Sequence, residues 1–351
     1  MSQAPRPEEA IATAAETPFA FTRRDVGQIG RRIWLLWGFH NLSLLAAGVA
    51  FFCFLAITPL IAATVMAYGL IADVGTVEQQ IAALTRVIPP DAASVLKGQL
   101  LQVVTTNSTV TGIGLVMAML LSIYGATYAA NGLIAALNVI NSEVETRGLV
   151  TLARRALGLT LAAMMIGLTG LISGGVFAWL TNLATPLFDG AVDVLVQGLA
   201  SLAALALGTG GFALIMRYGP DRHPAKWRWL TPGAIIATLL WMAASFGFSL
   251  YVAYISNYSA TYGSLSAVVI FLIWLYLSAY GVLLGALVNA ELERQTAADS
   301  TQGADRPLGS RGAVLADTVV TLGLTEAYLQ KRKRRHEDRL ARIARRKDPA
   351  L

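Results

Sequence analysis

Charged side chains are scarce in this sequence. Asp, Glu, Lys and Arg together make up 14% of its 351 residues, whereas hydrophobic residues make up 55%. A soluble globular domain normally has about a quarter of its residues charged. The shortage indicates that most of the chain does not face water. We therefore expect an all-α membrane protein, built as one helical bundle with short tails, rather than a set of soluble domains.

Cysteine and histidine are nearly absent as well. The single cysteine, Cys53, lies in an apolar run and cannot form an intrachain disulfide, and the three histidines are too scattered for a zinc site. The sequence also lacks the G-x-x-x-x-G-K, H-E-x-x-H and G-x-S-x-G patterns and any carboxylate cluster for magnesium. We therefore expect no catalytic residue, no metal ion and no cofactor, and predict that the protein is not an enzyme.

Long stretches without any charge predict the membrane spans. They cover residues 33–72, 98–142, 156–188, 194–216 and 229–290. A spanning helix needs about 20 mostly apolar residues, so the last stretch, which a polar turn interrupts, is long enough for two spans. The dipeptide Thr231-Pro232 predicts an N-cap and the first helical position of the fifth span. The six expected spans are approximately 44–71, 111–138, 156–180, 192–216, 232–256 and 264–290.

Lysine and arginine crowd one side of the predicted membrane. If both termini lie inside the cell, four segments face the cytoplasm: the two tails and the connections that follow the second and fourth spans. These segments hold all 27 Lys and Arg residues except Arg86 and Lys97. Because cytoplasmic loops carry an excess of basic residues, we expect a multi-pass protein with both termini in the cytoplasm.

Three parts are expected along the chain. Residues 1–22 predict a disordered N-terminal tail, 23–295 the membrane domain, and 296–351 a cytoplasmic linker with a basic C-terminal helix. Within the membrane domain, 23–40 predict an amphipathic entry helix, and the outer loop 72–110 predicts two short amphipathic helices. The arginines that form one side of the entry helix are Arg23, Arg24, Arg31 and Arg32.

The C-terminal part combines a polar stretch, 296–311, which is typical of a linker, with a strongly basic segment. Each basic residue near an anionic membrane surface contributes about 1 kcal/mol of attraction. The alternatives are a solvated tail that fixes orientation and a nucleic-acid contact. We expect membrane lipids, including anionic lipid at this tail, as partners, and no nucleic acid. The basic run consists of Lys331, Arg332, Lys333, Arg334 and Arg335.

Polar side chains gather on one face of the second predicted span, at the spacing i, i+4, i+7 and i+14. An Asn amide that faces lipid is costly, so we expect this face to point into the bundle. It either lines a substrate path or forms hydrogen bonds between helices, and the second interpretation is favoured for each residue. The members are Tyr124, Tyr128, Asn131 and Asn138.

The sixth predicted span has a similar face. Gly281 and Gly285, like Gly170 and Gly174 on the third span, form a Gly-x-x-x-Gly pattern that predicts close helix contact. The carboxylate at the inner end of the sixth span is expected to be hydrated at the membrane interface. The polar members of this span, candidates for a substrate path or for hydrogen bonds between helices, are Ser278, Asn289 and Glu291.

Several segments carry a family resemblance through their order and spacing. They are AFFCFLAITPL at 50–60, AALN at 135–138 with EVETR at 143–147, YGSL at 262–265 and GALVNAE at 285–291. Over about residues 25–295 the chain resembles the YihY/BrkB family of bacterial inner-membrane proteins. Relatives often carry Glu where this chain has Leu287, which puts in doubt any family mechanism that depends on that carboxylate, unless Glu291 replaces it.

The resemblance implies a location in the bacterial inner membrane but no settled activity. Some family members were once labelled as the transfer-RNA-processing ribonuclease BN, and others have been linked to the handling of envelope lipids. The first hypothesis is a transporter or flippase-like protein for an amphiphilic, lipid-like substrate. The alternative is a structural or partner-binding protein of the cell envelope, and the third hypothesis is a membrane-tethered ribonuclease.

Overall fold

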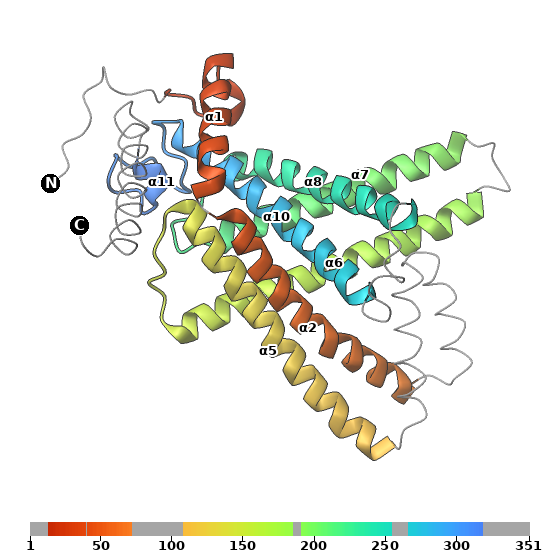
Figure 1. The fold of residues 1–351 in the computed structure, drawn as a ribbon. Coiled ribbons are helices and arrows are strands. Elements are labelled where there is room, and N and C mark those ends of the chain that lie inside the picture. Colours follow the sequence, from red (N-terminus) through yellow and green to blue (C-terminus); the bar gives the residue numbers. More distant parts are fainter. Residues whose placement is uncertain (1–12, 40, 72–107, 185–190, 255–265, 319–351) are drawn as a thin grey trace, which may run out of the picture.

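The computed structural model describes residues 13–39, 41–71, 108–184, 191–254 and 266–318. Within these ranges the regular elements are all helices (Figure 1). A short 3-10 helix, η2 (Pro18–Ala20), precedes α1 (Arg23–Phe39), which corresponds to the predicted entry helix. The others are α2 (Leu42–Ile71), α5 (Ser108–Asn141), α6 (Leu149–Ala184), α7 (Ala191–Tyr218), α8 (Trp227–Tyr254), α10 (Ser266–Arg294) and α11 (Val314–Asp317).

Each of the six predicted spans overlaps one long helix. Among the described residues, four stretches are long and apolar enough to cross a bilayer, and Leu42–Ala56 on α2 is a shorter apolar stretch. The prediction of a helical membrane bundle is confirmed, whereas the number of six spans and the side on which the termini lie stay predictions. The four stretches are Ile113–Asn141, Val194–Tyr218, Trp227–Phe248 and Val268–Arg294.

The long helices converge at one end of the bundle and spread apart toward the other (Figure 1). We call the converging end the polar end; it comprises α1 and the connections 142–148, 219–226 and 295–313. α2 packs along α5, α6 along α7, and α10 contacts α2, α5 and α8. α10 thus joins the pair α2 and α5 to the group that contains α8.

The hydrophobic core of the described residues lies near the polar end. Its main cluster draws on the first turns of α2 and α8 and on the last turns of α5, α7 and α10. Apolar side chains farther along the helices, such as Ile113, Leu195 and Phe246, are largely exposed. When the protein lies in a membrane, lipid surrounds these side chains instead of water. Central members of the cluster are Leu42, Leu137, Met216, Leu230 and Leu283.

The start of α8 differs from the prediction. α8 begins at Trp227, more than one turn before Pro232, and the Thr231 hydroxyl donates to the Trp227 carbonyl at 2.9 Å. The prediction of an N-cap at Thr231 is therefore wrong. Next to the proline, Asn289 on α10 accepts a hydrogen bond from the backbone N–H of Gly233 at 2.7 Å.

α8 and α10 approach most closely at two glycines. A Cβ atom on Gly233 would collide with the carbonyl oxygen of Gly285, and a Cβ atom on Gly285 would collide with that of Gly233. The close contact predicted from Gly281 and Gly285 is therefore confirmed at Gly285. A Cβ on Gly281 would only reach ordinary contact distance, 3.5 Å from Leu240 Cβ. The surroundings of Gly170 and Gly174 lie outside the described side chains.

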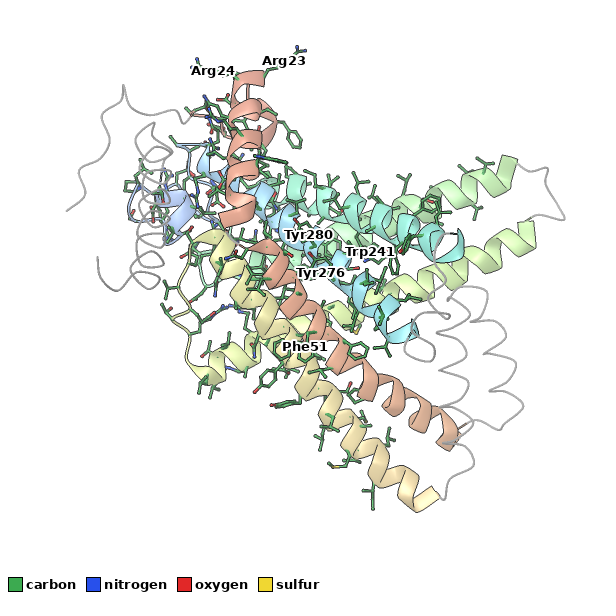
Figure 2. All side chains as sticks on the ribbon, viewed as in Figure 1. Arg23, Arg24, Phe51, Trp241, Tyr276 and Tyr280 are labelled. Carbon is green, nitrogen blue, oxygen red and sulfur yellow. The ribbon has the colours of Figure 1, made fainter. Side chains whose placement is uncertain are left out.

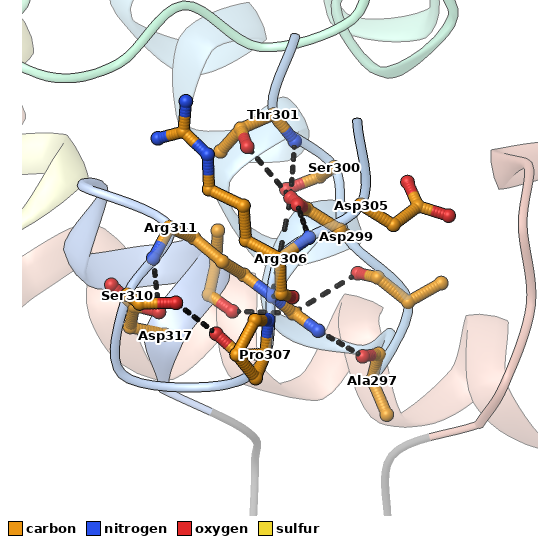
Figure 3. A network of polar contacts seen from close by, with 12 residues as sticks. Ala297, Asp299, Ser300, Thr301, Asp305, Arg306, Pro307, Ser310, Arg311 and Asp317 are labelled. Carbon is orange, nitrogen blue, oxygen red and sulfur yellow. Dashed lines mark hydrogen bonds and ion pairs between the residues drawn. The ribbon is translucent and has the colours of Figure 1, made fainter. Parts of the chain in front are cut away.

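Residues 296–311, predicted to be a linker, form a folded loop against the polar end. The carboxylate of Asp299 accepts hydrogen bonds from the backbone N–H groups of Thr301 and Arg306, each at 2.8 Å (Figure 3). Arg311 donates to the carbonyl oxygens of Ala297 at 2.9 Å and Ala316 at 2.8 Å. The linker prediction is wrong because these two side chains satisfy the backbone of the loop.

The end of the predicted N-terminal tail packs on the same loop. Thr13 donates its backbone N–H to the Gln295 carbonyl at 3.0 Å and accepts from Ala297 at 2.8 Å. Residues 13–22 are therefore ordered against this loop, in contrast to the prediction of a disordered tail over 1–22. The predicted outer helices in 72–107 and the basic run 331–335 lie outside the described residues.

Candidate functional site

Charged side chains are buried at the polar end, where α1, α10 and the connection between α7 and α8 meet. We call Arg32, Glu291, Arg222 and Glu293 the ion-pair cluster. Arg32, Glu291 and Glu293 are each less than 9% exposed. The side chain of Arg222 is 4% exposed. Charges removed from water in this way are stable only when they are paired and hydrogen-bonded.

The first pair ties α1 to α10. Glu291 is 0% exposed, and its Oε2 lies 2.7 Å from Arg32 Nε. Arg32 also donates to the Glu291 carbonyl at 3.2 Å, and Arg294 Nε lies 3.6 Å from Glu291 Oε1. The expectation that the interface hydrates Glu291 is therefore wrong, because α1 covers this end of α10 and supplies a guanidinium in place of water.

The second pair ties α10 to the connection after α7. Arg222 Nη1 donates to Glu293 Oε2 at 2.8 Å and to Asn141 Oδ1 at 3.0 Å, and Arg222 Nη2 pairs with Glu293 Oε1. The hydroxyl of Ser300 donates to the same Oε1 atom. A cavity of about 10 Å³ between Asn141, Arg222, Asn289 and Glu293 has room for about one water molecule. Sequence reasoning missed this pair.

Asn138 bonds to two loops at the polar end, the one after α5 and the one after α7. Its Nδ2 donates to Glu145 Oε2 at 2.8 Å, and its Oδ1 accepts from the backbone N–H of Asp221 at 2.7 Å. Arg147 Nε lies 2.6 Å from Glu145 Oε1, and the Thr146 hydroxyl donates to Asp221 at 2.7 Å. Asn138 therefore joins α5 to two loops, 142–148 and 219–226, and the favoured interpretation of this face, hydrogen bonds between helices, stays a prediction.

Two carboxylates of these connections have lowered pKa values. Hydrogen bonds from Arg147 lower the pKa of Glu145 below its ordinary 4.5. Burial opposes the shift at Asp221, but hydrogen bonds from Thr146 lower its pKa below 3.8 overall. Groups with lowered pKa values stabilise the folded state above their unfolded pKa, and this stability is lost as pH falls through the folded pKa.

We therefore expect the detergent-solubilised protein to lose stability below about pH 4.5, where carboxylates begin to be protonated. A variant that combines Glu145→Gln with Asp221→Asn lacks this contribution. Its drop in Tm between pH 7 and pH 3.5, measured by thermal unfolding, should be roughly 2–4 °C smaller. Glu16→Gln, at an exposed position, is the control with an unchanged drop. Equal drops in all three proteins would contradict the assignment.

Asn289 holds three helices together inside the bundle. Besides accepting from Gly233, it donates through Nδ2 to the Leu230 carbonyl at 2.8 Å and contacts Met216 Sδ at 3.3 Å. It thus joins α10 to α8 and α7. Ser278, by contrast, donates to the Trp274 carbonyl of its own helix at 2.8 Å.

The second-span face does not point inward along its whole length. Tyr124 is 61% and Tyr128 43% exposed, with their ring centroids 4.5 Å apart. Because the helices spread away from the polar end, neighbours cover the face at Asn138 and leave it open at the tyrosines. Asn131, between them, is half-buried, and its Oδ1 accepts no hydrogen bond from the described residues.

Residues 34–308 match the family described as Virulence factor BrkB. This chain belongs to the BrkB family. A UPF0761 membrane protein of Tolumonas auensis is 27% identical to it over 277 residues, 77% of this chain and 86% of that protein. Another, of Rhodospirillum centenum, is 29% identical over 300 residues, 84% of this chain and 63% of that protein. No solved structure matches.

A further relative carries an enzyme-like name. The "Putative ribonuclease-like protein YfkH" of Bacillus subtilis is 29% identical over 180 residues, which cover 50% of this chain and 64% of that protein. The match thus spans less than two thirds of YfkH, as it does of the Rhodospirillum protein. In the described part of this chain, no three His, Cys, Asp or Glu side chains gather where they could hold a metal ion.

Leu287 of this BrkB-family chain lies on α10, in apolar surroundings. That side chain is fully buried in the main apolar cluster. The carboxylates of α10 lie farther along the helix, at Glu291 and Glu293, where Arg32 and Arg222 pair with them. An unpaired carboxylate at position 287 would lie among apolar side chains.

Proposed function

We propose that this BrkB-family protein is a transporter or flippase-like protein for an amphiphilic, lipid-like substrate of the cell envelope. We place it in the bacterial inner membrane with both termini in the cytoplasm. The observation that carries the proposal is the shape of the bundle: its long helices meet at a closed polar end and spread apart toward the other end (Figure 1). A substrate would enter between the diverging helices from the surrounding lipid.

The contacts at the polar end suit a closure that can reopen. Arg32 and Arg222 cross from α1 and from a connection to Glu291 and Glu293, which both lie in the last turn of α10. Ion pairs can be exchanged for water when helices rotate, and the main apolar cluster, which lies at the same end, would have to shift with them. Transport by alternating access needs a bundle of this kind, in which one end opens as the other closes.

Asn131 is the polar group best placed to meet a substrate. It lies ten residues before the end of α5 at Asn141, which is about 15 Å along a helix and near the middle of a bilayer of about 30 Å. Unlike Asn138 and Asn289, it leaves a buried oxygen without a hydrogen bond from the described residues. A polar atom of this kind calls for an explanation, and a passing head group supplies one.

The test is translocation of fluorescent phospholipid analogues in proteoliposomes. We expect the protein to accelerate translocation and Asn131→Leu to slow it by about tenfold or more, equivalent to about 1.4 kcal/mol in the barrier. The Tm of this variant should not fall, because the buried Oδ1 makes no hydrogen bond with the described residues. Thr127→Val, on the same helix, removes a hydroxyl that donates to the Ile123 carbonyl of α5 and should leave the rate unchanged.

Two results would contradict the proposal. If Asn131→Leu lowered Tm and left the rate unchanged, Asn131 would be structural. If the protein accelerated translocation of no lipid analogue, the structural or partner-binding role of a membrane protein would take the place of transport.

A further inference from the structure

A groove opens between α6 and α7 near the polar end. It has a volume of about 440 Å³, within the usual range of about 300–1,000 Å³ for ligand sites. On α6 the lining residues follow the spacing i, i+3, i+4, i+7, i+8 and i+11, so they form one stripe of the helix. The lining residues are Thr151, Arg154, Arg155, Gly158, Leu159 and Ala162 on α6 and Leu214 and Tyr218 on α7.

The mouth of the groove is strongly basic. Arg154 and Arg155 lie in the second turn of α6, and both are exposed. No carboxylate in the described part of the chain forms an ion pair with either guanidinium. The arginines at the centre of the polar end behave differently, because Arg32, Arg147 and Arg222 all pair with carboxylates. The two groove arginines therefore keep their charge available for a ligand.

The groove changes from polar to apolar with depth. Tyr218, the last residue of α7, lies at the mouth, and Arg217 stacks within 5.5 Å of its ring centroid. Ala162 lies two helical turns beyond Arg155 and about 10 Å deeper along α6. A Cβ atom on Gly158 would meet nothing within 4 Å, so the space over this part of the stripe is open.

We propose that this groove binds an anionic phospholipid of the leaflet at the polar end. The phosphate would lie against Arg154 and Arg155, with Thr151 and Tyr218 as further hydrogen-bond donors. The first part of an acyl chain would lie over Gly158 and Ala162, against Leu159 and Leu214. Basic pockets between spanning helices on the cytoplasmic side bind acidic lipid head groups in this way. The site is separate from Asn131 and from the ion-pair cluster, and it does not depend on transport.

The test is native mass spectrometry of the full chain with phosphatidylglycerol and phosphatidylethanolamine of matched acyl chains. We expect preferential retention of phosphatidylglycerol and a loss of about 10- to 30-fold in its affinity when Arg154→Gln and Arg155→Gln are combined. The pair Arg154→Lys and Arg155→Lys should retain the preference, because it keeps both charges. Gly158→Leu should weaken binding of both lipids, because it fills open space.

The matched control is another arginine pair. Arg23 and Arg24 extend from the start of α1 away from the bundle (Figure 2), and changing both to Gln should leave lipid binding unchanged. Equal retention of the two lipids by the unmodified chain would overturn the proposal, as would full binding after loss of Arg154 and Arg155. Release of phosphatidylglycerol by excess inorganic phosphate would also overturn it, because the ligand would then be a free anion.

Discussion

Replacing Gly233 with Ala is expected to prevent stable assembly of α8 on α10. The added Cβ would overlap the Gly285 carbonyl oxygen and come within 2.5 Å of Asn289 Oδ1, so the two helices would have to separate. The change also disturbs the hydrogen bond from Gly233 to Asn289. Combined overlap and loss of a buried hydrogen bond should cost about 4 kcal/mol or more.

The measurement is the yield of monodisperse protein and its Tm in detergent. Gly247→Ala, on the same helix, is the matched control, because its Cβ would meet nothing within 4 Å. The same substitution thus tests one helix at a tight and at an open position. A Tm for Gly233→Ala equal to that of Gly247→Ala would show that the two helices do not approach closely at this glycine.

Replacing Glu291 with Ala should be nearly as damaging. It leaves the guanidinium of Arg32 buried without its carboxylate, a loss that costs about 3–5 kcal/mol for a buried pair. Combining Glu291→Ala with Arg32→Met removes the unpaired charge and fills the site with an apolar side chain. We therefore expect the double variant to recover most of the lost stability.

A double-mutant cycle on Tm separates this pairing from a general loss of packing. Asp305→Ala is the comparison for an exposed pair, since Asp305 contacts Lys226 with its side chain 80% exposed. Such surface pairs contribute about 0–1 kcal/mol. If the two single variants of the buried pair added without coupling, the ion pair would not hold α1 on α10.

Sequence patterns do not predict which buried charges form ion pairs. Arg32 and Glu291 are 259 residues apart, and the sequence predicts each as an interfacial charge of its own helix. Periodicity shows which residues of one helix share a face but does not show which helix covers that face. The loop 296–311 differs from its prediction for a related reason. Its composition predicts a linker, but the hydrogen bonds of Asp299 and Arg311 make it a folded element.

The prediction for the second span failed in part. The spacing placed Tyr124 and Asn138 on one face, and that geometry is correct for a single helix. How far a face is covered depends on the divergence of the neighbouring helices, which no pattern within one helix contains. Asn138 is buried and Tyr124 is exposed because the bundle is narrow at one end of α5 and wide at the other.

By itself, the sequence determined that this is a helical membrane protein, because a chain with so few charges over such long apolar runs must satisfy its backbone inside helices. It also predicted close helix contact from Gly281 and Gly285, which the structure has at Gly285, where a Cβ would collide with the Gly233 carbonyl oxygen. The tertiary structure alone decided which buried charges pair, where Asn289 bonds to the backbone of α8 beside Pro232, and which groove arginines have no carboxylate partner among the described residues. These features join residues far apart in the chain, and their free energy arises only when the helices are packed together.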